Sequence, residues 1–400
     1  MTSPKFSDTT TLFPAAGADA LPARALRIKF GVDPTSPNLH LGHSVALRQL
    51  RNLQEQGHTV LLVIGDFTAA IGDPTGRNTT RPALTAQAIE HNALTYLDQV
   101  FLFLNPEQTE VHWNSKWLGQ LSAAEMVRLT SRATVAQMSQ RNDFAKRLES
   151  GTPISLHEFI YPLLQGYDSV HLKCDVEIGG SDQTFNLMMG RSLQGLDGQP
   201  PQLVGTVPLL VGLDGERKMS KSFNNDIGLR EPLMEQLAKL MKLPDAQIRN
   251  WGELLTNTPV ATWDERLAQE NPRQVKLDMA RTILRTFHDK KLIEEAIEGW
   301  GRAVCFSAQA SDLEPEVLSQ VGPASLMDVL VRSGLCTSRS NARQKIDEGA
   351  VWVDGIRVVD RQTIVPEGFD GVLQVGKRNF KRISLGLAGS TFTAAPRRAP

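Results

Sequence analysis

The chain has 400 residues, of which 41% are hydrophobic and 22% charged, and its formal net charge at pH 7 is −1. Such a composition is typical of a globular protein with two or three domains, and a net charge near zero leaves any nucleic-acid contact to local basic patches. Cys174, Cys305 and Cys336 are far apart and form no CxxC pair. The sequence therefore predicts neither a zinc site nor a disulfide framework, and it fits a reducing cytosol.

The two ends of the chain differ from the rest in composition. Residues 1–24 lack a basic region followed by a long apolar run, and no window of the sequence resembles a membrane span. We therefore predict no secretory signal, no contact with a membrane and a cytoplasmic location. Residues 1–24 are expected to form a flexible segment or a short helix, and residues 386–400, rich in Ala, Thr, Pro and Arg, a flexible tail.

Residues 30–50 read FGVDPTSPNLHLGHSVALRQL and combine three elements. Ile28, Phe30 and Val32 predict a buried strand, and the residues rich in proline, serine and asparagine after it predict a turn. A helix then begins near His40. Free N–H groups and the dipole at a helix start favour an anion, so this arrangement suits a phosphate.

Three residues at the start of that helix fit a reaction at a phosphate. Gly42 lets a flat ring lie against the backbone because it has no Cβ. His40 and His43, three residues apart, point the same way on a helix, and two imidazoles there suit the charge that builds on a reacting phosphate. On its own, His-x-Gly-His is a weak signal, and two surface histidines in a helix cap are the more common explanation.

The next strand is predicted from the apolar run Val60–Gly65, which is typical of a parallel strand covered on both faces. A helical pattern over Ser44–Gln56 separates it from the first strand, which gives a βαβ unit and a Rossmann-like parallel sheet, an α/β fold. Asp73 follows this strand, where ligands of open α/β sheets bind. It could accept hydrogen bonds from an ammonium group or merely form a turn before Pro74. Arg81 could reach pyrophosphate or face solvent.

Further helices and one strand are predicted by spacing. The helices are expected over Thr85–Phe103 and Ala123–Leu148. The strand is expected within Val111–Trp117, where it leads into a turn.

A polar stripe follows at Tyr161, Gln165 and Asp168, which lie on one face of a predicted helix. Such a stripe is usually the solvated side of a helix, but this one ends in a carboxylate. The letters GGSDQ then place two glycines before Asp182 and Gln183. Consecutive glycines suggest close approach of a ligand to the backbone, and a tight turn is the competing explanation.

A second motif, Arg217–Ser222, reads RKMSKS. Lys218 and Lys221 lie in a loop after a glycine turn, and mobile ammonium groups can reach phosphates and neutralise charge for a moment. A basic loop alone is usually just solvated. In this order, however, HLGH and KMSKS make the chain resemble the class I aminoacyl-tRNA synthetases.

With the Tyr-x3-Gln-x2-Asp helix and the GGSDQ turn, the resemblance narrows to the tyrosyl-tRNA synthetases, and KMSKS is typical of one of their two bacterial branches. The resemblance covers about residues 27–385. It implies a ligase that activates L-tyrosine with ATP, accompanied by Mg²⁺, to tyrosyl-adenylate and pyrophosphate. The tyrosyl group then passes to the 3′-terminal adenosine of tRNA(Tyr). It also implies a catalytic domain over residues 25–230 and a homodimer joined through an insertion at about residues 115–165.

The resemblance implies a role for single residues, and no resident metal. Catalysis would rest on positioning and charge stabilisation by His40, His43, Lys218 and Lys221. Tyrosine would be bound by Asp73, Tyr161, Gln165, Asp168 and Gln183, with Asp168 accepting the phenolic hydroxyl. ATP would be bound by Gly31, Asp33, Thr35, Gly42, Arg81, Gly180, Asp182, Lys218, Met219, Lys221 and Ser222.

One position departs from the family. Many members carry a tyrosine two residues before the glycine of GxDPT, where this chain has Lys29. An ammonium group cannot accept a hydrogen bond, so the phenol would depend mainly on Asp168. A buried carboxylate built to bond a hydroxyl is left unpaired when phenylalanine enters. Tyrosyl enzymes are themselves the standard example, with discrimination of about 10⁵-fold.

Beyond residue 230 the sequence predicts a helical region over residues 231–320, which the family uses near the anticodon, and a small module over residues 325–385. The helices of the first region are expected over Pro232–Lys242, Asp264–Glu270 and Gln274–Trp300. The module is expected to have helices at Leu326–Ser333 and Ser338–Glu348, and strands around Val351–Val353 and Arg357–Val359.

The module resembles the αL-type RNA-binding module of a ribosomal protein, through the pattern SNARQKIDEGAVWVDG that starts at Ser340. Between Ser325 and Ile383, ten basic residues stand against seven acidic ones. The residues predicted to contact tRNA phosphates are Arg339, Arg343, Lys345, Lys377, Arg378 and Lys381. A solvated basic face is the alternative.

Two other functions stay open. A tryptophanyl-tRNA synthetase shares HLGH, KMSKS and the sheet, although the pattern ending in Asp168 and the C-terminal module argue against it. The chain could also be a catalytically inactive RNA-binding relative, against which the intact HLGH and KMSKS motifs argue.

Overall fold

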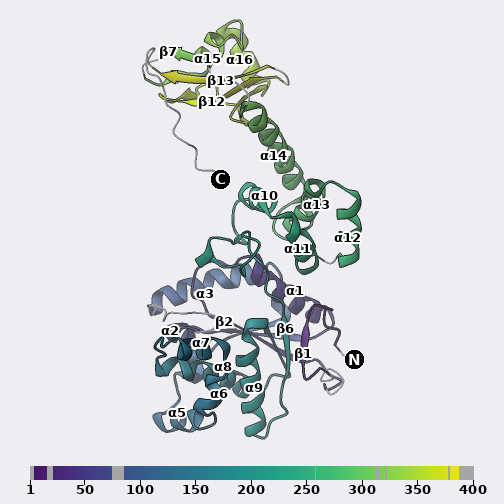
Figure 1. Ribbon diagram of the computed structural model, residues 1–400, viewed down its shortest axis with the longest axis vertical. Helices are drawn as coiled ribbons and strands as arrows, with labels where there is room; N and C mark the ends of the chain where they lie inside the picture. The colour runs from purple at the N-terminus through teal and green to yellow at the C-terminus, as the bar shows by residue number, and fades with distance from the viewer. Residues whose placement is uncertain are drawn as a thin grey trace. The chain divides into compact units, whose positions relative to one another are not determined.

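The computed structural model describes residues 4–15, 21–73, 85–256, 258–311, 316–319, 322–376 and 379–386 (Figure 1). Its contacts divide the chain into two compact units, residues 1–289 and 290–400. Helix α14 (Lys290–Ser311) thus groups with the C-terminal module, whereas the sequence pattern assigned residues 231–320 to a single helical region. Within the described part of the chain, no helix has the length and apolar character needed to cross a bilayer.

The first unit is built on a six-stranded sheet with the order β1-β6-β5-β2-β3-β4. Five of its strands are parallel: β2 (Arg27–Val32), β3 (Thr59–Ile64), β4 (Thr109–Trp113), β5 (Val176–Gly180) and β6 (Leu203–Val207). The sequence predicted a parallel sheet and the first three of these strands, but not β5 and β6. The apolar run of β3 is buried from Val60 to Ile64, as expected for a strand covered on both faces. This confirms the Rossmann-like α/β fold.

Residues 4–15 of the N-terminal segment contain a strand, which corrects the expectation of a flexible or helical stretch there. Strand β1 (Thr11–Phe13) pairs antiparallel with β6, with Thr11 opposite Thr206. The backbone N–H of Lys5 donates to the side chain of Gln56 at 2.7 Å, so the segment is also fastened to the end of α1. Threonine and phenylalanine favour a strand, and the free edge of β6 supplies the partner.

Helices cover both faces of this sheet (Figure 1). Helices α1 (Leu41–Glu55) and α3 (Ala86–Val100) lie on one face, and α8 (Leu156–Leu172) and α9 (Thr184–Leu196) on the other. Short α2 (Asp66–Ile71) follows β3. Leu61 and Val63 of β3 pack in one core cluster with Leu163 and Leu164 of α8 and Leu193 of α9.

The helix predicted over Ala123–Leu148 is divided into α5 (Ala123–Thr130), α6 (Val135–Ser139) and α7 (Asn142–Glu149), after a short α4 (Ser115–Leu118). Capping residues explain the division. Ser122 exchanges bonds with Glu125 at the start of α5, and Thr134 does so with Gln137 at the start of α6. Each pair closes a new helix N-terminus.

The helices α10 (Leu233–Lys242), α11 (Ile248–Leu255), α12 (Val260–Gln269) and α13 (Pro272–Leu284) complete the first unit. The long helix predicted over Gln274–Trp300 is wrong, because the chain turns between α13 and α14. Within that turn the ring of Phe287 meets the edge of Phe103, and the imidazole of His288 bonds to Gln236 at 2.7 Å. These tertiary contacts favour the break over a continuous helix. Helix α11 was not predicted.

The second unit carries a sheet with the order β10-β9-β12-β13-β7 and the separate pair β8 and β11. The predicted helices and first two strands are confirmed as α15 (Leu326–Arg332), α16 (Arg339–Asp347), β9 (Val351–Val353) and β10 (Ile356–Val358). The other strands are β7 (Glu316–Ser319), β8 (Ala324–Ser325), β11 (Ile364–Val365), β12 (Asp370–Val375) and β13 (Asn379–Gly386).

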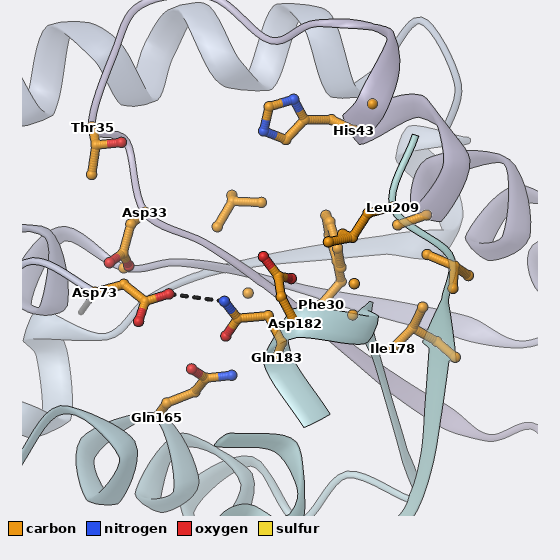
Figure 2. Close-up of a pocket in the computed structure, with 18 of the residues that line it drawn as sticks. Phe30, Asp33, Thr35, His43, Asp73, Gln165, Ile178, Asp182, Gln183 and Leu209 are labelled. Atoms are coloured by element: carbon orange, nitrogen blue, oxygen red, sulfur yellow. Dashed lines mark hydrogen bonds between the residues drawn. The ribbon is translucent and has the colours of Figure 1, made fainter. Parts of the chain in front are cut away.

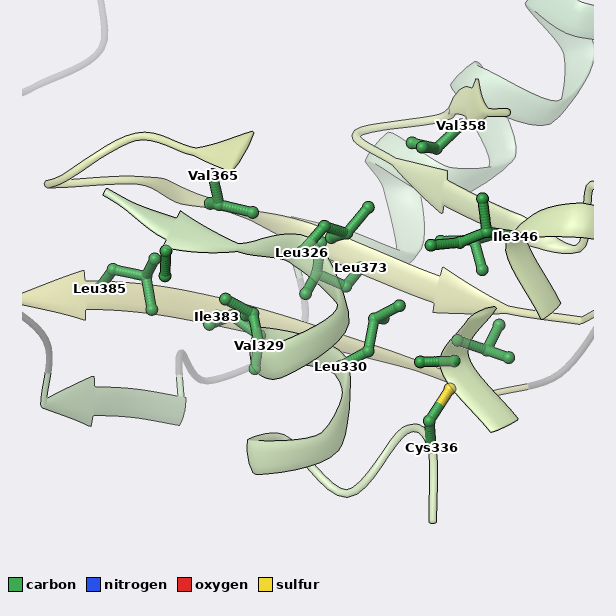
Figure 3. Packing of buried hydrophobic residues seen from close by; sticks show 14 residues of the cluster. Leu326, Val329, Leu330, Cys336, Ile346, Val358, Val365, Leu373, Ile383 and Leu385 are labelled. Carbon is green, nitrogen blue, oxygen red and sulfur yellow. The ribbon is translucent and has the colours of Figure 1, made fainter. Parts of the chain in front are cut away.

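The core of this unit lies between its helices and its sheet (Figure 3). Leu330 of α15 and Ile346 of α16 pack in one buried cluster with Leu373 of β12 and Ile383 of β13. The apolar residues of the two helices recur at helical spacing, and those of the strands fill the facing side of the sheet. The module therefore has a core of its own. The predicted tail, residues 386–400, lies almost entirely outside the described residues.

Candidate active site

A cavity of about 650 Å³ opens at the carboxyl ends of β2, β3, β5 and β6, where ligands of open α/β sheets bind. Most of the predicted site residues line it: Gly31, Asp33, Thr35, His40, Gly42, His43, Asp73, Tyr161, Gln165, Asp168, Gly180, Asp182, Gln183, Lys218, Met219 and Ser222. The side chain of Lys221 reaches the turn after β2, where its Nζ donates to Ser36 at 3.1 Å. Arg81 lies outside the described residues.

Asp33, the first residue after β2, is held from two sides. It accepts hydrogen bonds from the hydroxyl of Thr68 at 2.7 Å and from that of Tyr161 at 2.8 Å. Burial raises the pKa of the Asp33 carboxyl to about 7, against the lowering effect of these two donors. Gly65 makes room for the arrangement, since a Cβ there would stand 2.0 Å from an Asp33 oxygen.

Asp73 and Gln183 face each other across the same side of the cavity (Figure 2). The Nε2 of Gln183 donates to Asp73 at 2.8 Å, and Asn186 donates to the Oε1 of Gln183 at 2.9 Å, which fixes the orientation of that amide. Gln165 and Asp33 lie nearby. Two carboxylates and two amides therefore surround one space, an arrangement that suits an ammonium group.

Asp168 is 3% exposed and lies on the cavity-facing side of α8. The Nε1 of Trp117 donates to one of its oxygens at 2.8 Å, and Asn114 donates to the other at 3.3 Å. Burial raises the pKa of the Asp168 carboxyl to about 6, while the nearby ammonium of Lys29 and these donors act in the opposite direction. The stripe predicted on α8 is thus its buried side, not its solvated one.

Asn114 and Trp117 were not predicted as part of the site. They follow β4, whose carboxyl end meets the same edge of the sheet as those of β2 and β3. An asparagine and a tryptophan directly after a parallel strand were the available signal, because that edge is where site residues gather.

His40 precedes the first residue of α1, and His43 lies in its first turn. Their ring centroids are 4.0 Å apart, and the backbone N–H of His40 donates to the Nδ1 of His43 at 3.2 Å, so Nε2 carries the proton of that neutral ring. Burial lowers the pKa of His40 to about 2 and that of His43 to about 4, and the positive charge of Lys221 acts in the same direction. Both imidazoles are therefore neutral near pH 7 and can offer hydrogen bonds to a ligand, but no charge.

The KMSKS loop folds over the start of α1. Met219 is buried, and its sulfur accepts the backbone N–H of Gly42 at 3.3 Å. Lys218 reaches into the cavity, with its Nζ 2.6 Å from a carboxylate oxygen of Asp182. A Cβ on Gly180 would stand 2.8 Å from Asp182 and 2.9 Å from Leu209. A larger residue at that position would therefore make the side chains of Asp182 and Leu209 shift.

Four of the predicted RNA-binding residues, Arg339, Arg343, Lys345 and Lys381, lie at the surface of the second unit. Arg339 and Arg343, four residues apart, lie on one side of α16, and Lys345 lies on the other side of its buried residues. Arg339 pairs with Asp328 at 2.7 Å, Lys345 with Glu348 at 2.7 Å, and Lys381 with Glu316 at 2.9 Å. Lys377 and Arg378 lie outside the described residues.

Comparison with known protein families agrees with this geometry. Residues 21–303 match the family described as tRNA synthetases class I (W and Y), and residues 325–368 match the S4 domain. The chain belongs to this class I synthetase family. Within it, curated relatives identify the chain as a member of the bacterial tyrosine–tRNA ligases.

Two such relatives illustrate the similarity. The tyrosine–tRNA ligase of Xanthomonas axonopodis pv. citri is 49% identical over 370 residues, which cover 90% of this chain and 92% of the relative. That of Thermotoga maritima is 45% identical over 367 residues, covering 90% and 91%. The tyrosyl-tRNA synthetase of Archaeoglobus fulgidus complexed with L-tyrosine has a TM-score of 0.59 at 22% identity and covers 74% of this chain and 96% of that one, which supports the fold.

Proposed function

We propose that this cavity activates L-tyrosine with ATP and then transfers the tyrosyl group to tRNA(Tyr). The observation that carries the proposal is that two chemically different ends share one cavity. At one end lies the buried carboxylate of Asp168, which accepts hydrogen bonds from Trp117 and Asn114. At the other end lie His40, His43 and Lys218, the first lysine of KMSKS. A small amphipathic amino acid fits the first end and a triphosphate the second.

Tyrosine would enter with its ring toward α8. Asp168 would accept the phenolic hydroxyl, because its oxygens accept from Trp117 and Asn114 and retain further lone pairs. The α-ammonium group would lie near Asp73, Tyr161 and Gln165, with Gln183 beside them. The carboxylate of the substrate would then point toward the triphosphate.

ATP would lie along the start of α1. Gly31, where a Cβ would meet nothing within 4 Å, leaves open space beside the backbone, and Gly42 keeps the first turn of the helix accessible. Asp182 and Gly180 would border the ribose, Asp33 and Thr35 would lie near the substrates, and Met219 and Ser222 would position the loop. Mg²⁺ enters as part of the Mg–ATP substrate.

The reaction needs no nucleophile from the protein. A tyrosine carboxylate oxygen attacks the α-phosphorus, the bond to the bridging oxygen breaks, and pyrophosphate leaves with that electron pair. His40, His43, Lys218 and Lys221 would stabilise the charge on the phosphates and hold them in line. In the second step the terminal ribose hydroxyl of the tRNA attacks the tyrosyl carbonyl, and AMP leaves.

The C-terminal module would hold the tRNA through Arg339, Arg343, Lys345 and Lys381, joined by Lys377 and Arg378. The phosphates would replace the carboxylates that Arg339, Lys345 and Lys381 pair with now. Residues 231–320 would serve near the anticodon. The location is proposed as cytoplasmic, in agreement with the three widely spaced cysteines.

We also propose that the protein is a homodimer joined through the insertion at about residues 115–165. This segment exposes several large apolar side chains, among them Val127, Val135, Leu148 and Leu156, and exposed apolar surface is typical of an interface. Sedimentation of the full chain tests this. A Val135→Glu/Leu156→Glu variant should sediment as a monomer, and a dimer unchanged by both substitutions would contradict this interface.

Amino-acid-dependent exchange between ATP and pyrophosphate tests the activation step, with tyrosine, phenylalanine and tryptophan in parallel. Exchange with tyrosine alone is expected. Exchange with tryptophan instead would assign the chain to the other substrate of the family, and no exchange with any of the three would identify an inactive relative.

A further inference from the structure

Lys29 is fully buried in the middle of β2, next to the cavity but not among the residues that line it. A lysine is almost never fully buried unless it is paired. Here the Nζ of Lys29 lies 2.9 Å from a carboxylate oxygen of Glu177 on β5. The same atom donates to the hydroxyl of Ser169 and to the backbone carbonyl of Gln165, each at 2.8 Å.

These bonds join three elements at one point. Gln165 and Ser169 are four residues apart on α8 and enclose Asp168, so Lys29 holds the helical turn that carries the proposed phenol acceptor. Glu177 is itself fixed by Ser169, whose hydroxyl donates to it at 3.1 Å. The position of the Asp168 carboxylate relative to the sheet therefore depends on the lysine.

The charges around Asp168 come from several elements. Lys29 of β2 lowers the pKa of the Asp168 carboxyl, and Glu177 of β5 raises it, with Lys29 the stronger of the two. Asp33, after β2, and Tyr161 of α8 interact with the same carboxylate, and Cys174 faces the lysine. Trp117 and Asn114 contribute neutral donors. Among these groups Lys29 supplies the positive charge.

We propose that Lys29 is a positioning residue for tyrosine recognition: it holds the turn of α8 that carries Asp168 and keeps that carboxylate ionised as the acceptor for the phenolic hydroxyl. The proposal rests on the assignment of the phenol to Asp168. Glu177 is the counter-ion that makes the buried lysine tolerable. The lysine thus acts on the substrate through Asp168 and not by direct contact.

Equilibrium dialysis of labelled L-tyrosine against the full chain, without ATP, tests the proposal between pH 5 and pH 8. In the wild type, the affinity for tyrosine should fall in two steps as the pH drops: near pH 7, where Asp33 beside the ammonium space takes up a proton, and near pH 6, where Asp168 does. The midpoint of the second step is the readout. Lys29→Met removes the charge that favours the ionised carboxylate, so the midpoint should rise by about one pH unit or more. Glu177→Gln should move the midpoint the other way.

A buried charge left without its partner can unfold a protein, so Lys29→Met/Glu177→Gln is the decisive variant. Replacing both members of a buried pair by neutral groups of similar size is well tolerated. Because Lys29 is the stronger influence on Asp168, the midpoint of the double variant should still lie above that of the wild type. A matched control is Lys276→Met, which breaks a pair with Asp245 (2.6 Å) on a different part of the unit and should leave the midpoint unchanged.

Three outcomes overturn the proposal or its basis, and they can be told apart. Lys29 is only a structural residue if the double variant keeps the wild-type midpoint. The same holds if its affinity for tyrosine is lower than that of the wild type by the same factor at every pH. Asp168→Asn should remove the step near pH 6 and the preference for tyrosine over phenylalanine, and it should leave the Asp33 step near pH 7 in place. If Asp168→Asn retains the step near pH 6 and that preference, the assignment of the phenol to Asp168 is wrong and the proposed function fails at that point.

Discussion

The Nζ of Lys218 lies 2.6 Å from a carboxylate oxygen of Asp182, so the loop lysine expected at the phosphates is paired with the carboxylate expected at the ribose. The pair is partly exposed, and an exposed ion pair contributes little stability. Breaking this pair so that Lys218 and Asp182 each bind another group therefore costs little free energy. ATP can offer a ribose hydroxyl to Asp182 and a phosphate to Lys218 in the same event.

Replacing Lys218 tests this exchange. Lys218→Ala should slow pyrophosphate exchange by about 10² to 10³-fold, the usual effect of removing one group that stabilises transition-state charge. The dissociation constant for tyrosine, measured by equilibrium dialysis, should not change, because the tyrosine end of the cavity is untouched. Arg217→Ala is the matched control, since Arg217 belongs to the same loop but bonds to Asp214 at 2.9 Å. Equal losses in both variants would contradict the role of Lys218.

The two histidines should act without a positive charge. Because burial lowers the pKa of His43 to about 4, the imidazole is neutral from about pH 5.5 upward, and its titration should leave no trace in the rate of activation near pH 6.5. His43→Asn, which retains a donor, should lose less activity than His43→Ala in single-turnover formation of tyrosyl-adenylate. The prediction would be contradicted if the wild type lost activity with an apparent pKa near 6.5 and the His43 variants did not.

The same shift predicts a stability effect of defined sign. The folded-state pKa of His43 lies below the usual value of about 6.5, so the unfolded chain binds the proton more readily between about pH 4 and pH 6.5. The stability contribution of the neutral ring is complete above pH 6.5 and is lost as the pH falls toward 4. Between pH 7.5 and pH 5, the wild type should lose about 2 to 4 °C more in Tm than His43→Asn does. Equal losses in a thermal melt would contradict the lowered pKa.

Strands β2 and β3, the stripe on α8 and the two motifs were predictable because each has a local pattern. The apolar run of β3 and the spacing of Tyr161 and Asp168 depend only on neighbours in the sequence. The structure adds what those patterns do not contain: Trp117 and Asn114 reach Asp168 from more than 50 positions away in the chain. The break near Phe287 likewise depends on a contact with Phe103. Strand β1 was missed because its partner is β6, almost two hundred residues later.

Two glycines at strand ends should respond differently to the addition of one methyl group. In Gly65→Ala the new Cβ would meet Asp33 at 2.0 Å and Thr68 at 2.4 Å, so both side chains must move. We expect a loss of about 1 to 3 kcal/mol in the free energy of unfolding, as for other overpacked sites, and weaker tyrosine binding. In Gly31→Ala the Cβ meets nothing within 4 Å, so stability should be unchanged while the KM for ATP rises. Denaturant unfolding measures the effect on stability, and pyrophosphate-exchange kinetics measure the effect on substrate binding. If Gly65→Ala were as stable as the wild type and bound tyrosine normally, the predicted clash with Asp33 and Thr68 would be wrong.

The surface of α16 allows a test that separates tRNA binding from activation. Arg339→Ala/Arg343→Ala should weaken tRNA binding and lower the slope of log affinity against log salt, by about one for each phosphate that is no longer neutralised. Pyrophosphate exchange should be unaffected, because activation requires no tRNA and the altered residues lie in the second unit. Arg51→Ala, which removes an exposed arginine of α1 paired with Glu55, is the control for the loss of a surface arginine outside the proposed tRNA site. If the double variant binds tRNA with the wild-type affinity and salt slope, the basic side of α16 is simply solvated and the tRNA is held elsewhere.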